Sequence, residues 1–424
     1  MITVLNWMRK NKGEVMKDCG ENISRRSFLR RTAASVVGAG IGISAVTGKL
    51  TASGGEPEKE GGDNGAPSIK EYRKLGKTGW KVSDLGFGNA GMKDPALLEY
   101  AIDRGINYVD TARQYYDMEK VVGKLFPAKR DKVFVTTKLM PELITADVSE
   151  AEILGGIEES LKRLNTDYID CCLIHSVGDP ELGDRSRIEN PAVASAFEKA
   201  IEQGKIRNWG ASSHGPKMVD DFEWLLDNTS IDMIMPGMNM LTAGLGPVIE
   251  KASNRGVAVV AMKSLSAARK INYSAFMREG RTARQGLIKW MLAQPGIDTI
   301  SITMTTFEQI DEYVEVSGRS DLTPEEEKVL EGYGMLLDRD YCRPGCDGCL
   351  GSCPHGLPIH DILRYNLYFD NYGREKYAIG RYARLPEGRK AGQCLNCPGY
   401  CESSCRYNLS VRSMMLRAHS NLTV

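Results

Sequence analysis

Residues 105–116, G-I-N-Y-V-D-T-A-R-Q-Y-Y, decide the fold because they form a short apolar strand pattern that ends in polar groups. Two similar segments follow it, at 132–139 (KVFVTTKL) and 167–176 (DYIDCCLIHS). Long helical patterns alternate with such segments, which is typical of βαβ units and a parallel sheet. We therefore predict an α/β chain built on a (β/α)8 TIM barrel, with strands at 82–87, 106–110, 133–138, 168–174, 206–211, 232–236, 258–263 and 298–303.

Four polar residues, Asp110, Tyr115, Lys138 and His175, stand at or just past the ends of these three strand segments. In a closed barrel, the C-terminal strand ends line one shared mouth, so we expect the four side chains to meet there. An ammonium group favours phenolate, so Lys138 should lower the pKa of Tyr115 and make it a general acid near neutral pH. Asp110 can pair with Lys138, and His175 can orient a carbonyl oxygen.

The order D-T-A-x-x-Y, a strand ending in T-T-K, and D-Y-I-D-x-x-x-I-H resembles the aldo-keto reductase superfamily over about residues 72–316. In that superfamily an Asp, Tyr, Lys and His form the catalytic tetrad of a (β/α)8 barrel that uses NADPH. The resemblance implies that Asp110, Tyr115, Lys138 and His175 are catalytic. It also implies an oxidoreductase that reduces a small-molecule carbonyl substrate.

The resemblance suggests contacts for NADP(H) as well. Ser212 and Ser213 take the place of the family's Ser-Asn pair, which holds the carboxamide, and Lys263 is placed to reach a phosphate or the substrate.

Three positions depart from the family pattern, and all of them belong to the cofactor half of the site. Met235 replaces a glutamine, and Met262 replaces the aromatic residue that stacks on the nicotinamide. Gln309 stands where a phosphate-binding arginine is often found, and it supplies no charge. The catalytic half of the pattern is therefore better kept than the cofactor half.

Eight of the eleven cysteines lie in the last part of the chain, in two groups. Spacings of two or three residues let thiolates converge on one inorganic centre. The first group ends in C-x2-C-x3-C-P and resembles bacterial ferredoxins with two 4Fe-4S clusters, in which the last cysteine of each run ligates the other cluster. The resemblance implies one cluster on Cys342, Cys346, Cys349 and Cys405, and another on Cys394, Cys397, Cys401 and Cys353.

Four disulfides and structural zinc are the alternative interpretations of these cysteines. Two other cysteines, Cys171 and Cys172, are expected to be ordinary core residues. The segment between the cysteine groups is rich in Tyr and Arg. Local signals add two helix starts, because Ser149 and Glu152 have the spacing of a capping box, and Thr323 precedes a proline.

The N-terminal region is typical of a targeting signal. Ser24-Arg25-Arg26-Ser27-Phe28-Leu29-Arg30, followed by a weakly apolar stretch, resembles the twin-arginine export signal, with a basic amphipathic arm as the alternative. Cleavage after Ala52 or an uncleaved anchor are both compatible with it. We expect a leader at 1–52, a disordered linker at 53–68, the barrel at 69–317, and a helix with a small helical, ferredoxin-like 4Fe-4S domain at 318–424.

The formal net charge of zero gives no indication of a nucleic-acid partner, and no run of 18 apolar residues suggests a membrane span. Together the signals predict a periplasmic or otherwise exported oxidoreductase. Its partners would be the twin-arginine export machinery and an electron-donor protein or membrane redox partner. Its electrons would come from NADP(H) or, through two 4Fe-4S clusters, from that donor. The alternative function is an electron-transfer or interaction subunit whose barrel is a scaffold.

Overall fold

The structure is a computed structural model that describes residues 66–88, 92–242, 244–265, 283–337 and 339–423. The proposed leader and most of the proposed linker lie outside these residues. Among the described helices, none combines the length and the apolar character needed to cross a bilayer.

Eight parallel strands close into a barrel in the order β10-β3-β4-β5-β6-β7-β8-β9. Each strand overlaps one of the eight predicted ranges, so the prediction of a (β/α)8 barrel is confirmed. The strands are β3 (Leu85–Gly88), β4 (Tyr108–Asp110), β5 (Phe134–Lys138), β6 (Ile169–Ile174), β7 (Ile206–Ser213), β8 (Met233–Pro236), β9 (Ala258–Met262) and β10 (Thr299–Ile302).

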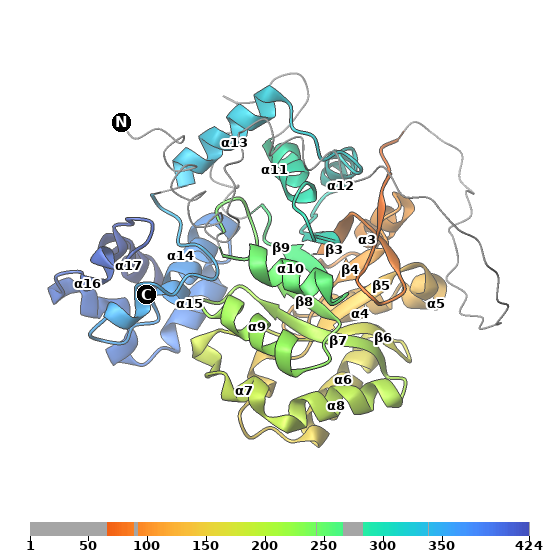
Figure 1. Cartoon of the computed structure of the whole chain (residues 1–424), viewed down its shortest axis with the longest axis horizontal. Helices are drawn as coiled ribbons and strands as arrows, with labels where there is room; N and C mark the ends of the chain where they lie inside the picture. The colour runs from red at the N-terminus through yellow and green to blue at the C-terminus, as the bar shows by residue number, and fades with distance from the viewer. Residues whose placement is uncertain (1–65, 89–91, 243, 266–282, 338, 424) are drawn as a thin grey trace. The chain divides into compact units, whose positions relative to one another are not determined.

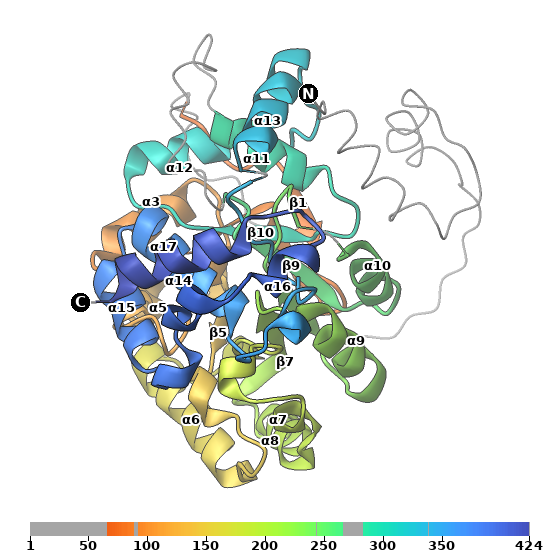
Figure 2. The same cartoon turned by 90° about the vertical axis from the view of Figure 1, so that its left-hand side faces the viewer.

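Helices follow the strands and cover the outside of the barrel (Figure 1, Figure 2). A buried apolar layer between strands and helices forms the largest core. These helices are α3 (Pro95–Asp103), α4 (Met118–Gly123), α5 (Phe126–Lys129), α6 (Glu150–Leu164), α7 (Ser186–Glu189), α8 (Pro191–Glu202), α9 (Met218–Asn228), α10 (Gly246–Asn254), α11 (Ala283–Leu292), α12 (Phe307–Val314) and α13 (Pro324–Leu337). Short 3-10 turns lie at 130–132, 141–143 and 180–182.

The first predicted strand, 82–87, joins two separate elements and was wrong in this respect. Strand β2 (Lys81–Ser83) pairs antiparallel with β1 (Tyr72–Lys74), and β3 begins only after Asp84. The Asp84 carboxylate interrupts the run because it accepts hydrogen bonds from the Ser317 hydroxyl and the Gly318 amide.

The hairpin β1–β2 closes the end of the barrel at which the strands begin. Leu75 and Val82 are fully buried against the inner barrel layer, and the Trp80 ring meets Phe134 edge to face at 5.8 Å. Cys171 belongs to this inner layer, whereas Cys172 belongs to the outer layer, and both are fully buried. The prediction that they are core residues is confirmed.

Helix α13 packs on α11 rather than with the cysteines. Leu287 of α11 contacts Leu330 and Tyr333 in one apolar cluster, and Lys289 forms a buried 2.7 Å ion pair with Glu326. Helix α13, the helix expected at the start of 318–424, therefore contributes to a small cluster with α11. The second core belongs to the tail that follows.

The cysteine-rich tail is helical, as expected, with its own buried apolar cluster. Two of its helices, α14 and α17, pack along each other, and the short α16 carries one cysteine (Figure 2). The elements are α14 (Ile359–Tyr372), α15 (Glu375–Ala383), α16 (Tyr400–Ser403) and α17 (Val411–Leu422), with 3-10 turns at 350–352, 387–389 and 391–396.

Candidate active site

The barrel brings Asp110, Lys138 and their partners together at its open end. Asp110 ends β4 and Lys138 ends β5, and the Lys138 ammonium donates to Asp110 Oδ1. Lys138 also donates to the Thr111 carbonyl oxygen at 2.9 Å, and Asp110 Oδ2 accepts from the Ser301 hydroxyl at 2.9 Å. Lys138 is fully buried, and burial alone would lower its pKa, but Asp110 and Tyr115 outweigh burial and raise it. The ammonium is therefore fixed and charged.

Tyr115 lies in the loop after β4, with its ring centroid 5.1 Å from the Lys138 ammonium. Burial raises the pKa of Tyr115 above its usual value, and Lys138 counters this rise only in part. The sequence-based expectation of a lowered tyrosine pKa was therefore wrong, because desolvation of the phenolate outweighs the attraction of the ammonium. The consequence is a hydroxyl that stays protonated throughout the neutral pH range.

His175 follows β6 directly, and its ring meets that of Tyr115 nearly at right angles, with centroids 5.9 Å apart. Burial lowers the pKa of His175 well below its usual value, and the charges of Lys138 and Lys263 lower it further. Its Nδ1 is buried and has no hydrogen-bond partner among the described residues. The imidazole is therefore neutral and can donate one hydrogen bond.

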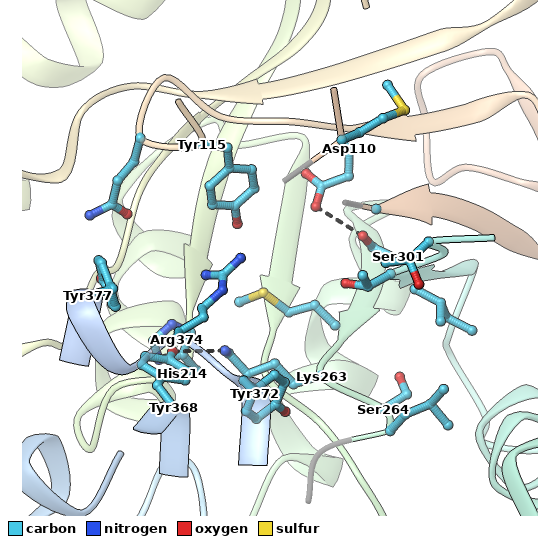
Figure 3. A pocket seen from close by; sticks show the side chains of 18 of the residues that line it. Asp110, Tyr115, His214, Lys263, Ser264, Ser301, Tyr368, Tyr372, Arg374 and Tyr377 are labelled. Carbon is cyan, nitrogen blue, oxygen red and sulfur yellow. Dashed lines mark hydrogen bonds between the residues drawn. The ribbon is translucent and has the colours of Figure 1, made fainter. Parts of the chain in front are cut away.

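A cavity of about 950 Å³ opens over these side chains (Figure 3). Asp110, Tyr115 and His175 line it from the barrel, and the fully buried Lys138 lies behind them. The tail lines the same cavity from the other side, with Tyr365, Tyr368, Tyr372, Arg374, Tyr377 and Arg381. Sequence reasoning noted the Tyr- and Arg-rich segment but did not place it at the barrel mouth.

An ion-pair network joins the tail to the loop after β6. Arg364 of α14 pairs with Asp179 at 3.0 Å and with Asp361 at 2.8 Å. Arg381 of α15 pairs with Glu181 at 2.9 Å, and the Tyr365 hydroxyl donates to the same carboxylate. The carboxylate oxygens of Asp179, Glu181 and Asp361 lie within 4.8 Å of one another, and the two guanidinium groups balance most of their charge.

Comparison with known proteins agrees with this geometry. Residues 89–269 match the Aldo/keto reductase family. These residues are therefore similar to an aldo/keto reductase domain. The uncharacterized oxidoreductase YqkF of Bacillus subtilis is 28% identical over 302 residues, which cover 62% of this chain and 95% of that protein. L-glyceraldehyde 3-phosphate reductase of Escherichia coli K12 is 26% identical over 264 residues, 55% of this chain and 74% of that protein.

Solved structures agree with the barrel as well. A thermostable aldo-keto reductase in complex with the inhibitor epalrestat has a TM-score of 0.51 at 26% identity, covering 62% of this chain and 100% of that one. An aldo-keto reductase from Klebsiella pneumoniae, in complex with NADPH, has a TM-score of 0.51 at 24% identity over 62% of this chain and 95% of its own. The latter likeness shows the fold alone.

Two of the three predicted cofactor contacts in the reductase domain do not face the cavity. The Ser212 hydroxyl donates to the Ile174 carbonyl oxygen at 3.4 Å, and the Ser213 hydroxyl donates to the carbonyl oxygen of Val177. Both serines are buried and neither lines the cavity. The structure therefore gives no support to nicotinamide contacts from Ser212 or Ser213, because both hydroxyls already donate to nearby backbone carbonyl oxygens.

Lys263, the third predicted contact, does line the cavity and lies just past β9. Met262 also lines it, whereas Met235 belongs to the inner layer of the barrel. Gln309 lines the cavity too, but its side-chain oxygen accepts hydrogen bonds from the Thr305 amide and hydroxyl, each at 2.8 Å. The predicted cofactor contacts of the cavity thus offer fewer free polar groups than the end that holds Tyr115 and His175.

The eight tail cysteines are free thiols and gather in two sets. Cys353, Cys394, Cys397 and Cys401 line one small cavity. Burial raises the pKa of the Cys342 thiol well above its usual value, and the neighbouring thiols of Cys346, Cys349 and Cys405 raise it further. Cys405 of the second run therefore lies near the thiols of the first run, and Cys353 of the first run lies near those of the second.

The contacts of these thiols bear on the three alternatives of disulfides, zinc and iron–sulfur clusters. None of the eight cysteines forms a disulfide. Thiolates around tetrahedral zinc lie about 3.8 Å apart, but among the described residues the three carboxylates above are the only group with ligand atoms all within 4.8 Å. Backbone amides of Leu357 and Leu409 donate to the sulfurs of Cys353 and Cys405 at 3.4 Å.

Proposed function

We propose that this chain is an exported oxidoreductase of aldo-keto reductase type that reduces a small carbonyl compound with Tyr115 as the proton donor. We further propose that its tail holds two 4Fe-4S clusters. The observation that carries the first proposal is the meeting of Tyr115, His175 and the Lys138–Asp110 pair in one cavity. The proteins similar to this chain include reductases of L-glyceraldehyde 3-phosphate and of methylglyoxal, which favours a small aldehyde or ketone as the substrate.

The residue roles follow from their protonation states. Tyr115 keeps its proton at neutral pH and can give it to a carbonyl oxygen, while Lys138 stabilises the phenolate that remains. Neutral His175 donates a hydrogen bond to the same oxygen and so fixes its direction. Asp110 acts through Lys138, since it holds the ammonium in place and does not itself reach the substrate.

A nicotinamide, when bound, supplies a hydride to the carbonyl carbon. The tetrad end of the cavity suits such a group, and Lys263 is available for an anionic part of it. The committed hydroxyls of Ser212 and Ser213 and the neutral Gln309 weigh against a strong NADP(H) site. We therefore propose a reduction that is either NADP(H)-linked or supplied with electrons through the tail.

For the clusters we propose one set of ligands made of Cys342, Cys346, Cys349 and Cys405, and another made of Cys353, Cys394, Cys397 and Cys401. The two thiol sets and the amide contacts to sulfur support this assignment. Clusters of this kind carry single electrons. An external donor protein or membrane redox partner would then be the source of electrons.

Export by the twin-arginine route, to the periplasm, is proposed from the sequence alone. Its support is the motif at residues 24–30 together with the cysteine tail. That route carries proteins that have already folded and received their cofactors in the cytoplasm.

A second candidate is an electron-transfer or interaction subunit with a catalytically weak barrel. The observation that favours it is the tail over the barrel mouth, where Tyr368 and Arg374 take space that a substrate or cofactor would otherwise use. The two candidates differ in whether Tyr115 is needed for turnover.

Tyr115→Phe tests the proposal directly. The variant removes only the acidic proton, so carbonyl reduction is expected to fall at least about a hundredfold, while circular dichroism and thermal unfolding stay unchanged. Tyr116→Phe is the matched control, because Tyr116 is the neighbouring tyrosine and is 71% exposed. Reduction should be assayed with NADPH and with a low-potential chemical donor in separate reactions. Turnover at the wild-type rate in Tyr115→Phe would exclude the proposed role.

A further inference from the structure

The charged residues that line the reductase cavity are mostly basic. Six basic residues and three acidic residues line it. The basic ones are Lys93, Lys263, Arg284, Arg364, Arg374 and Arg381. Such an excess of positive charge in a partly enclosed space favours the entry of anions.

Ion pairs within the protein neutralise three of these six cations. Arg364 pairs with Asp179, Arg381 with Glu181, and Arg284 with Glu312 at 3.2 Å. Lys93 is exposed at the rim. For Lys263 and Arg374, no carboxylate of the described residues comes within ion-pair distance, and both are more than half buried.

Arg374 reaches the reacting end of the cavity from the tail. Gly373, in the left-handed conformation with a φ of 61°, ends α14, and the Arg374 amide then donates to the Tyr368 carbonyl oxygen at 3.1 Å. This turn points the side chain into the cavity (Figure 3). Burial raises the pKa of Tyr115, and the charges of Lys138 and Arg374 both counter that rise, so Arg374 lies close enough to act on the proton donor.

Lys263 approaches the same point from the barrel. It is one of few non-glycine residues with a positive φ, 62°, a strained conformation that often marks functional positions. Its ammonium donates to the Tyr368 hydroxyl at 3.0 Å (Figure 3). Its charge lowers the pKa of His175 in addition to burial, and Arg374 lies within electrostatic range of Lys263 itself. The two cations therefore line the same cavity as Tyr115 and His175.

We propose that Arg374 and Lys263 form an anion-binding subsite beside Tyr115, which selects carbonyl substrates that carry a carboxylate or a phosphate group. The guanidinium fork of Arg374 suits two oxygens of such a group, and Lys263 adds a point charge held by Tyr368. The tail thereby completes the substrate site instead of only covering it. This inference rests on the proposed function for its role in catalysis. If the protein reduced no carbonyl compound, the same site would bind an anion but would select no substrate.

The test compares matched anionic and neutral ligands on the full chain. Butanal and succinic semialdehyde form the carboxylate pair, and glyceraldehyde and glyceraldehyde 3-phosphate form the phosphate pair. Calorimetric titration with succinate and with glycerol 3-phosphate measures anion binding without any turnover. The variants are Arg374→Gln, Arg374→Lys and the control Lys376→Gln, which removes an exposed charge from the same helix α15 outside the cavity.

Wild type is expected to prefer the anionic member of at least one pair, and the pair shows whether the group is a carboxylate or a phosphate. Arg374→Gln should weaken binding of that anion by roughly tenfold or more and raise its KM by a clearly larger factor than the KM of the neutral partner. Arg374→Lys should recover part of the loss, and Lys376→Gln should behave as wild type. Equal effects on both members of a pair, or no anion binding by wild type, would overturn the proposal.

Failure of the proposed function looks different from failure of this subsite. If no carbonyl compound is reduced but the anions still bind in an Arg374-dependent way, the subsite stands and the reductase assignment falls. If reduction of neutral aldehydes requires Tyr115, but Arg374→Gln changes neither the binding nor the KM of the anionic compounds, the reductase assignment stands and the subsite falls. Tyr115→Phe should leave the calorimetric binding of both anions in place.

Discussion

The buried lysines at the cavity differ mainly in whether an opposite charge offsets the free-energy cost of burying them. Lys138 is buried with Asp110 against it, so its pKa is raised and its charge is secure. Lys263 has only tyrosine hydroxyls and other cations near it, so burial lowers its pKa to about 8. Burial of a charge without a counter-ion costs free energy in the folded state. The two lysines therefore have opposite effects on stability, although both are buried and both lie within electrostatic range of His175.

Lys263→Met should stabilise the protein at pH 7. The pKa of Lys263 lies below that of an unfolded lysine, so the unfolded chain binds the proton more tightly and stability rises as pH increases from about 8 to 10.5. Below pH 8 the full cost is present, and its removal should raise the unfolding free energy by about 3 kcal/mol. The groups that face this lysine are Tyr368, Tyr372, Arg364, Arg374, His175 and His214. Denaturant unfolding of both proteins at pH 7 and pH 10 measures the effect.

Lys93→Met is the control for this experiment, because Lys93 is an exposed lysine on the rim of the same cavity. A lower stability of Lys263→Met at pH 7 would contradict the account. The stabilised variant is expected to bind anions less well, since a charge that is costly to bury is often retained for function.

At the scale of single elements, close backbone approach and helix ends explain local sequence choices. Strand β7 approaches β8 so closely that a Cβ on Gly210 would lie 1.9 Å from the Met233 carbonyl oxygen. Helix α6 begins with a complete capping box, in which Ser149 and Glu152 each satisfy a backbone amide of the other. The same helix contains Gly155, whose Cβ would meet nothing within 4 Å. One glycine is thus required by packing, and the other is not.

Gly210→Ala should destabilise the protein by about 3 kcal/mol, because backbone atoms of two central strands would have to separate. Gly155→Ala, the same substitution in an exposed helix, should stabilise by about 0.5–1 kcal/mol, since alanine loses less backbone entropy on folding. Thermal unfolding midpoints of the two variants provide the comparison. A tolerated Gly210→Ala would mean that β7 and β8 lie further apart than described.

For the whole molecule, the docking of the tail on the barrel decides the shape of the active site. The contact depends on three carboxylates and two guanidinium groups, with Glu181 between Arg381 and Tyr365. Burial, with added repulsion from Asp361 and Asp179, raises the pKa of Glu181 to about 7. The contact thus holds three carboxylates but only two guanidinium groups. The ionisation of Glu181 therefore links the docking of the tail to pH.

Glu181→Gln should make tail docking less sensitive to pH. Because the pKa of Glu181 in the folded protein exceeds its unfolded value, its contribution is complete below about pH 4.5 and is lost as pH rises to 7. At pH 8 the variant should therefore be more stable than wild type by about 2 kcal/mol, with little difference at pH 5. Calorimetric unfolding across this range measures it. Glu142→Gln, a half-exposed partner of the same Arg381, should change stability by only a few tenths of a kcal/mol.

Cysteine substitutions test how the tail is assembled. If the two sets each hold a 4Fe-4S cluster, the wild-type chain purified without oxygen should contain about eight iron atoms and eight acid-labile sulfides. Cys405→Ser and Cys353→Ser should each reduce the iron content by about half, although the two residues lie in different sequence runs. Zinc in place of iron, or unchanged iron in both variants, would contradict the assignment. Cys172→Ser, in the barrel core, should leave the iron content unchanged.

Much of the barrel was predictable because its signals are local. Apolar runs of strand length, turn residues and capping pairs such as Ser149 and Glu152 act over a few residues, so they located all eight strands and the start of α6. The hairpin β1–β2 was missed because Tyr72–Lys74 contains no apolar run and because Lys81–Ser83 was merged with the strand that follows it. The packing of α13 on α11 was missed as well, since it depends on distant partners such as Lys289 and Glu326.

By itself, the sequence determined the barrel, the position of Asp110, Tyr115, Lys138 and His175 at or just past strand ends, and the two closely spaced runs of cysteines. These features follow from periodicity and from short spacings, which are properties of neighbouring residues. Only the tertiary structure decided that burial raises the pKa of Tyr115, that Ser212 and Ser213 turn to the backbone, and that Arg374 joins Lys263 beside the tetrad. The physical reason is that desolvation and long-range contacts depend on what the whole chain packs around a group, which no local pattern records.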